Sequence, residues 1–354
     1  MSALPAAKTS DGRFFEDFRA GERFVHATPR TLTDGDAALY AALFGSRFAV
    51  QSAEPFAQAI GYPSSPLDDL LVFHTVFGKS VADISLNAIA NLGYADARFL
   101  RPVYAGDTLS ASSRVIGLKE NSNRQSGVVT VRTTGTNQRG ETVIDYVRWV
   151  MVRKRSPDSP APAATSPALP ASVPADALGA ACPPLDLSRY DFALAGSPHR
   201  FGDYGIGERI DHVDGVTVEE AEHQIATRLF QNSARVHFNQ FSEGQGRFGR
   251  RLIYGGHVIS LARAISFNGL ANAFHIAAIN GGRHVAPLFA GETVFAWSAI
   301  VEGAALPDRD DVGALRLRTI ATKNRPCGDF PLRQGEGYEP NVILDLDYWV
   351  LIPR

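Results

Sequence analysis

The stretch Phe15–His26 reads FEDFRAGERFVH, and the stretch Phe201–His212, 186 residues later, reads FGDYGIGERIDH. A second match joins Pro102–Thr108 to Pro287–Thr293 at an offset of 185 residues. Self-similarity over such distances is typical of a repeated fold. We therefore predict a tandem duplication whose two halves pack against each other through equivalent surfaces, as the subunits of a homodimer do.

The offset between the repeats grows toward the C-terminus. Trp149 matches Trp349, which is an offset of 200 residues. The second half must therefore carry insertions, and we place them at Glu302–Val312 and Asn324–Asn341. Both segments are rich in Gly, Pro and Asp, so we expect both to be loops.

The chain length and the position of the prolines predict the domain boundaries. A length of 354 residues corresponds to roughly two domains of about 150 residues each. Residues 156–184 hold 8 of the 21 prolines and 9 alanines, a composition that favours an extended connection. We predict a first unit at residues 1–155, a Pro/Ala-rich linker at 156–188 and a second unit at 189–354.

Each half has the same order of predicted elements. A short strand and a capped helix come first, and a longer helix follows, Leu70–Ala82 in one half and Val258–Asn268 in the other. This longer helix is apolar on nearly every face, which is typical of a buried helix. Four strand-like runs complete each half, at about 91–100, 108–118, 127–137 and 141–153, and at about 277–285, 293–300, 313–324 and 341–352. One buried helix with consecutive antiparallel strands indicates the α+β class.

Composition excludes several classes of protein. The 35 basic and 37 acidic residues give a net charge of −2, which argues against binding nucleic acid by bulk charge. Two cysteines cannot form a disulfide framework, no histidine pair has a common metal-ligand spacing, and no Gly-rich nucleotide motif occurs, so we expect neither metal nor cofactor. Without a leader or an apolar run near 20 residues, we expect a cytoplasmic chain with no membrane contact.

Two segments of the second half could carry out chemistry. Asn232 and His237 lie five residues apart, and a histidine can accept and return a proton near neutral pH. Gly255 and Gly256 stand immediately before the buried helix Val258–Asn268, where free backbone N–H groups can stabilise an oxyanion. His257 follows them and is either close to the substrate or a core residue.

This arrangement resembles the hydratase motif of MaoC-type hot-dog enoyl-CoA hydratases, in which a carboxylate precedes the catalytic histidine by five residues. Here Asn232 occupies the carboxylate position, so His237 must transfer the proton alone while Asn232 positions the water. The resemblance implies a double hot-dog fold, in which an antiparallel sheet wraps around a central helix twice, and an acyl-CoA thioester substrate. At an offset of 186 residues, Ser46 and Gln51 replace the pair, so we expect the first unit to be catalytically degenerate.

Over residues 13–354 the chain resembles the mesaconyl-CoA hydratase family more specifically, in segments that include Phe14–Phe18, Ser85–Ala95 and Arg325–Cys327. The resemblance implies reversible hydration of mesaconyl-CoA to β-methylmalyl-CoA in the ethylmalonyl-CoA pathway. The free carboxylate of that substrate needs a donor, and Arg235 is favoured as a substrate-binding residue over the other candidates, Arg250, Arg251, Arg283 and His284.

Other functions stay open at this point. The chain could hydrate another branched or dicarboxylic enoyl-CoA, or bind acyl-CoA without catalysis because one half has lost the motif. A thioester hydrolase is less favoured because Asn232 is not a carboxylate. A homo-oligomer is also left open.

Overall fold

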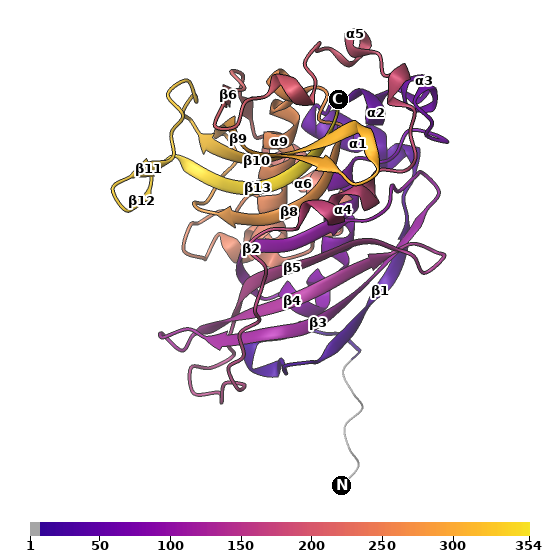
Figure 1. Ribbon diagram of the computed structural model, residues 1–354. Helices are drawn as coiled ribbons and strands as arrows, with labels where there is room; N and C mark the ends of the chain where they lie inside the picture. Colours follow the sequence, from indigo (N-terminus) through magenta and orange to yellow (C-terminus); the bar gives the residue numbers. More distant parts are fainter. Residues whose placement is uncertain (1–7) are drawn as a thin grey trace.

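One continuous antiparallel sheet runs through the computed structural model, which describes residues 8–354 (Figure 1). Its eleven strands follow the order β1-β3-β4-β5-β2-β8-β13-β10-β9-β6, with β7 beside β9. The first five strands come from the first unit and the others from the second. The predicted α+β double hot-dog is therefore confirmed.

The first unit folds its strands around helix α4, Asp69–Lys79, which packs on β3 and β4. Ten of its eleven residues are buried, as the apolar sequence predicts. The strands of this unit are β1 Arg23–Thr31, β2 Ala88–Phe99, β3 Thr108–Glu120, β4 Ser126–Thr136 and β5 Thr142–Arg153. Its other α-helices are α1 Asp34–Phe44, α2 Ala49–Ser52 and α3 Glu54–Ala59.

The second unit repeats this arrangement around helix α9, Gly255–Ile265, which packs on β9, β10 and β13. Its strands are β6 Arg209–Asp211, β7 Val216–Thr217, β8 His275–His284, β9 Thr293–Leu306, β10 Arg309–Lys323 and β13 Val342–Pro353. Its other α-helices are α5 Phe192–Ala195, α6 Glu220–Leu229, α7 Arg235–Phe238, α8 Gln240–Glu243 and α10 Phe267–Leu270. In the part of the chain that the structure describes, no helix has the length and hydropathy to span a membrane.

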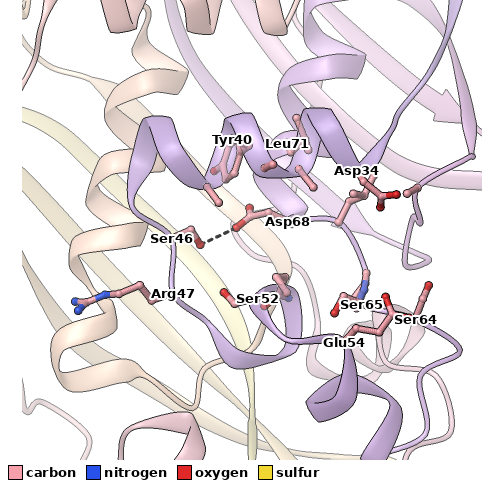
Figure 2. A pocket seen from close by; sticks show the side chains of 17 residues that line it. Asp34, Tyr40, Ser46, Arg47, Ser52, Glu54, Ser64, Ser65, Asp68 and Leu71 are labelled. Atoms are coloured by element: carbon pink, nitrogen blue, oxygen red, sulfur yellow. Dashed lines mark hydrogen bonds between the residues drawn. The ribbon is translucent and has the colours of Figure 1, made fainter.

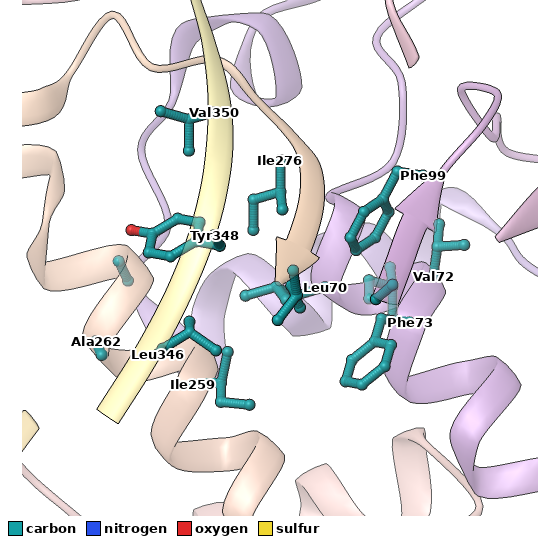
Figure 3. Packing of buried hydrophobic residues seen from close by; sticks show 14 of the residues in the cluster. Leu70, Val72, Phe73, Phe99, Ile259, Ala262, Ile276, Leu346, Tyr348 and Val350 are labelled. Carbon is teal, nitrogen blue, oxygen red and sulfur yellow. The ribbon is translucent and has the colours of Figure 1, made fainter. Parts of the chain in front are cut away.

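The two units join where β2 pairs with β8. The antiparallel register runs from Arg98 opposite Ala278 to Gly93 opposite Arg283, and it ends there. One apolar cluster continues across this seam. Figure 3 shows side chains of α4, α9, β8 and β13 packed together in it. The halves therefore share a core, as the comparison with a homodimer predicts.

A close helix approach also connects the units. A Cβ atom at Gly78 of α4 would overlap the carbonyl oxygen of Phe230, which follows α6 of the second unit. Only glycine permits this contact. The ends of α4 and α6 are thereby held together, directly beside the turn that contains Asn232.

The structure corrects the expected insertions in the second half. Segment 302–312 is not a loop, because β9 and β10 extend through it as a hairpin whose last pair is Leu306 opposite Arg309. Segment 324–341 contains a small hairpin of β11, Arg333–Gln334, and β12, Gly337–Tyr338. Gly, Pro and Asp in a sequence mark turns, and they do not show how far the flanking strands continue.

The linker packs against both units, and it is not extended throughout, because Ala175–Ala181 form a 3-10 helix. Thr165 forms an isolated bridge with Leu118 of β3. Further along, Val173 and Leu178 are buried, and the backbone N–H of Val173 donates to Asn280 Oδ1 on β8 at 2.8 Å. The linker therefore contributes to the core despite its composition.

Candidate active site

A cavity of about 320 Å³ lies where the two units meet. The first unit contributes β2 residues 89–92 and Met151 of β5, and the second unit contributes the segments around α7, the start of α9 and the end of β8. Most of the wall is apolar, which suits an acyl chain. Of the residues predicted for the site, His237 and Gly255 line this cavity.

His237 lies on α7 with its imidazole fixed in one orientation. Its Nδ1–H donates to the carbonyl oxygen of Leu252 at 2.9 Å, which leaves Nε2 free to accept a proton. Burial lowers the pKa of His237 to about 4, and the hydrogen bond to Leu252 offsets this only in part. The imidazole is therefore neutral at pH 7 and can act as a base.

The N-terminus of α9 supplies donors to the same cavity. The side chain of Tyr254 does not cap the helix, so the first N–H groups have no partner within it. A Cβ atom at Gly255 would overlap Cε1 and Nε2 of His284, and one at Gly256 would overlap the rings of Tyr254 and His74. Both positions therefore require glycine. Gly255 lines the cavity, whereas Gly256 lies behind it.

Asn232 occupies the turn between α6 and α7 and is almost fully buried. Its Oδ1 accepts a hydrogen bond from the backbone N–H of Ala234 at 3.3 Å. Its Nδ2 is buried and has no hydrogen-bond partner among residues 8–354. Leaving an amide donor unpaired is costly, so this nitrogen is suited to donate to a small ligand such as water. Asn232 is not part of the cavity wall itself.

The structure does not bring Arg235 or His257 into the cavity. The guanidinium of Arg235 donates to Asn87 Oδ1 and to the carbonyl oxygen of Asp11, so it joins the two units. The ring of His257 lies 4.8 Å from that of Phe44 and faces the first unit. Burial lowers the pKa of His257 to about 3. A substrate-binding role for either residue stays a prediction.

Three polar residues that line the cavity received no favoured role from the sequence: Asn91, Arg247 and His284. Asn91 belongs to β2 of the first unit. It lies far in sequence from His237 and outside the hydratase motif, so neither proximity nor the motif predicts it as a site residue. It does lie within the Ser85–Ala95 segment that carries part of the family resemblance. His284 was one of several candidates for a substrate carboxylate.

The first unit retains a cavity of about 590 Å³ at the equivalent place (Figure 2). Ser46 and Gln51 stand where Asn232 and His237 are in the second unit. Ser46 Oγ donates to Asp68 Oδ2 at 3.1 Å, and burial raises the pKa of Asp68. The N–H of Leu70, equivalent to that of Gly256, donates to Asp68 Oδ1 at 2.9 Å. This cavity therefore lacks an imidazole, and a carboxylate occupies the helix N-terminus that would receive an oxyanion.

Comparison with known proteins agrees with this geometry. Residues 1–328 match the family model described as mesaconyl-CoA hydratase. A Chloroflexus aurantiacus protein named beta-methylmalyl-CoA dehydratase is 61% identical over 350 residues, 99% of either chain. A Cereibacter sphaeroides protein named mesaconyl-CoA hydratase is 59% identical over 349 residues, 98% of this chain and 100% of the relative. The solved structure of a MaoC domain protein dehydratase from C. aurantiacus has a TM-score of 0.95 and 60% identity, and the match covers 99% of both chains.

Proposed function

Because the chain belongs to the mesaconyl-CoA hydratase family, a family of hydro-lyases that act on CoA esters, we propose that it reversibly hydrates mesaconyl-CoA to β-methylmalyl-CoA. The observation that carries the proposal is the position of His237. His237, whose Nε2 is free, and Gly255 at the N-terminus of α9 line the same apolar cavity. A base and an oxyanion site in one enclosure are what hydration of an enoyl thioester requires.

In the hydration direction, His237 Nε2 removes a proton from a water molecule that receives a hydrogen bond from Asn232 Nδ2. The water oxygen bonds to C3 of the acyl group, which carries the free carboxylate. The C2–C3 double bond opens, and its electrons move to the thioester oxygen to form an enolate. Gly255 N–H stabilises this oxyanion, with Gly256 N–H as a second candidate donor.

The second half of the cycle returns the proton. The imidazolium of His237 donates to C2, which carries the methyl group, and the enolate collapses to the thioester. The proton taken from water thus ends on carbon, and the histidine regains its neutral form. No cofactor is needed, because the step neither oxidises nor reduces the substrate overall.

We assign this chemistry to the second unit only and propose that the first unit is non-catalytic. Its cavity contains Gln51 in place of an imidazole, and its helix N-terminus is occupied by Asp68. The nearest alternative is hydration of another branched or dicarboxylic enoyl-CoA by the same groups. An assay separates the two, because loss of the conjugated enoyl absorbance can be followed with mesaconyl-CoA, with the unbranched dicarboxylic fumaryl-CoA and with the branched monocarboxylic tiglyl-CoA. We expect mesaconyl-CoA to be preferred, and equal or better turnover of either of the other two would contradict the proposal.

The pH profile tests the state of His237. Only the neutral imidazole can accept a proton, and burial lowers its pKa to about 4. We therefore expect kcat/KM to stay constant from about pH 8 to about pH 5 and to fall as the pH drops through the lowered pKa. An ordinary histidine would already lose half the activity near pH 6.5. Half-maximal activity near pH 6.5, with circular dichroism unchanged, would show that His237 is not shielded as described.

The phosphates of coenzyme A need cations near the cavity entrance. Another cavity, of about 630 Å³, adjoins the cavity between the units. The two share Ile89, Met151 and Arg247, and Arg153 also lines the larger one. Within residues 8–354, neither arginine forms an ion pair. We propose that Arg153 and Arg247 face the phosphates.

Replacing these cations should weaken substrate binding without altering the chemical step. We expect Arg247→Ala and Arg153→Ala each to raise KM about 2- to 10-fold at low salt, with kcat unchanged. The difference should shrink at high ionic strength, because salt screens exposed charges. Arg23→Ala, on the edge strand β1, is the control. An unchanged KM in both variants would place the phosphates elsewhere.

A further inference from the structure

Four polar side chains line the cavity between the units: Asn91, His237, Arg247 and His284. The proposed reaction uses His237, and Arg247 is exposed at the entrance. Asn91 and His284 therefore remain as the polar groups of the inner cavity without a role. We call them the inner pair.

A bulge in β2 determines the face on which the side chain of Asn91 lies. Asn91 is opposite Val150 of β5, and Gly93 is opposite the next residue, Trp149. Two steps along β2 therefore match one step along β5, and the regular register resumes with Tyr94 opposite Arg148. Val150 and Arg148 lie on the same face of β5 because alternate residues of a strand share a face. The extra residue thus brings Asn91 to the face that carries Tyr94.

The side-chain amide of Asn91 forms no hydrogen bond within the described part of the chain. Both Oδ1 and Nδ2 are buried, and neither has a hydrogen-bond partner among residues 8–354. A buried amide without partners destabilises the fold, so such a group is retained where a ligand satisfies it. Asn91 is one of the residues that line the cavity, so a molecule bound there is the group from outside the protein that lies nearest to this amide.

His284 approaches from the second unit at the end of β8. The pairing of β2 with β8 stops at Gly93 and Arg283, one residue before it, and the cavity opens there. Its Nε2 lies 3.4 Å from the hydroxyl of Tyr94, and none of the described residues hydrogen-bonds to its Nδ1. Burial lowers the pKa of His284 to about 4, so at neutral pH the ring has one N–H donor.

A buried positive charge lies beside Tyr94, whose hydroxyl is 3.4 Å from His284 Nε2. Arg148 is fully buried, stacks over the ring of Phe77 at 4.3 Å and is opposite Tyr94 in the sheet. Its Nη2 donates to Ser80 Oγ at 2.9 Å, but Nε and Nη1 have no partner. No carboxylate in the described part of the chain pairs with it. A guanidinium keeps its charge in proteins, so the positive potential favours an anion on the cavity side of Tyr94.

We propose that Asn91 and His284 bind the carboxylate at the far end of the acyl group and thereby select dicarboxylic thioesters. This inference rests on the proposed function for the identity of the acyl group. A carboxylate can accept hydrogen bonds from both an amide N–H and an imidazole N–H. The inner pair combines one such side chain from each unit. Selectivity is thus a property of the junction, and the isolated second unit would lack half of it.

The test compares two saturated ligands that cannot be hydrated, succinyl-CoA and butyryl-CoA, which differ by the terminal carboxylate. Isothermal titration should show that the wild-type protein binds succinyl-CoA more tightly. Asn91→Leu removes the donor at similar size and should weaken succinyl-CoA about 10- to 100-fold, with butyryl-CoA changed less than about threefold. Asn91→Asp keeps the shape but repels an anion, and it should weaken succinyl-CoA at least as much.

Two further variants complete the design. His284→Gln keeps an N–H donor and should retain more succinyl-CoA affinity than His284→Leu. Met151→Leu changes an apolar wall residue and should affect both ligands alike. Equal changes for the two ligands in both Asn91 variants, or no change in either, would overturn the proposal.

Turnover is measured separately from binding. If the wild-type protein selects succinyl-CoA through Asn91 but does not hydrate mesaconyl-CoA, the proposed function fails and the carboxylate site stands. If it hydrates mesaconyl-CoA and Asn91 does not discriminate between the two ligands, the carboxylate site fails and the function stands.

Discussion

His237→Ala should reduce kcat for the hydration of mesaconyl-CoA about 10²- to 10⁴-fold, the range that a positioned general base contributes. The variant loses the only imidazole of the cavity whose tautomer is fixed by a backbone carbonyl, that of Leu252. We do not expect His284 to replace it, because its Nε2 faces Tyr94 and Gly255 and the rest of the ring is assigned to the substrate carboxylate. KM should change little, because in our proposal the acyl group is held by the apolar wall of the cavity and the CoA phosphates by Arg153 and Arg247. The measurement is the initial rate of loss of enoyl absorbance.

His199→Ala is the matched control for this variant. His199 is exposed and lies in the segment before β6, away from the cavity wall. It should keep wild-type kcat and KM. If His237→Ala retained activity within about threefold of this control, the base would have to be another group, and the mechanism proposed above would be wrong.

The fold could be predicted in outline because a duplication leaves the same short pattern twice. The helix at Leu70–Ala82 was predicted from its apolar faces alone, and α4 indeed occupies Asp69–Lys79. The extension of β9 and β10 through 302–312 could not be predicted, because turn residues mark a reversal without showing the length of the paired strands. The packed linker was missed for a related reason, since a few apolar residues such as Val173 are enough to dock a Pro-rich segment on an existing surface.

The candidate site could be predicted only where its residues are close in sequence. His237 and Gly255 belong to one motif, and the structure places both in one cavity. Asn91 lies in the other unit, and a bulge determines the face on which its side chain lies. A single-sequence pattern indicates neither the junction between the units nor a one-residue irregularity in a strand. Charge and proximity in sequence favour Arg235 as a donor to a carboxylate, yet its guanidinium donates to Asn87 Oδ1. Proximity in sequence does not determine which cavity a long side chain enters.

Gly255→Ala should lower kcat about 10²- to 10³-fold, comparable to the loss of one oxyanion donor. A Cβ atom at this position would overlap the ring of His284, so either the ring or the first turn of α9 must move. Movement of the helix displaces the N–H groups from the thioester oxygen, and movement of the ring disturbs the inner pair. Both movements act on the bound substrate. We therefore expect a large loss of kcat/KM together with only a small decrease in melting temperature.

Gly281→Ala gives the control, because it lies on the same strand as His284 and a Cβ atom there would meet no atom within 4 Å. It should keep activity within about threefold of the wild type. The comparison therefore separates the loss of the oxyanion donor from the effect of adding a methyl group elsewhere in this region. Thermal melting of both variants shows whether each is folded at the assay temperature. If Gly255→Ala were folded and fully active, the N-terminus of α9 could not be the oxyanion site, and the stabilising donors would have to come from another part of the cavity wall, of which Asn91 is the first candidate.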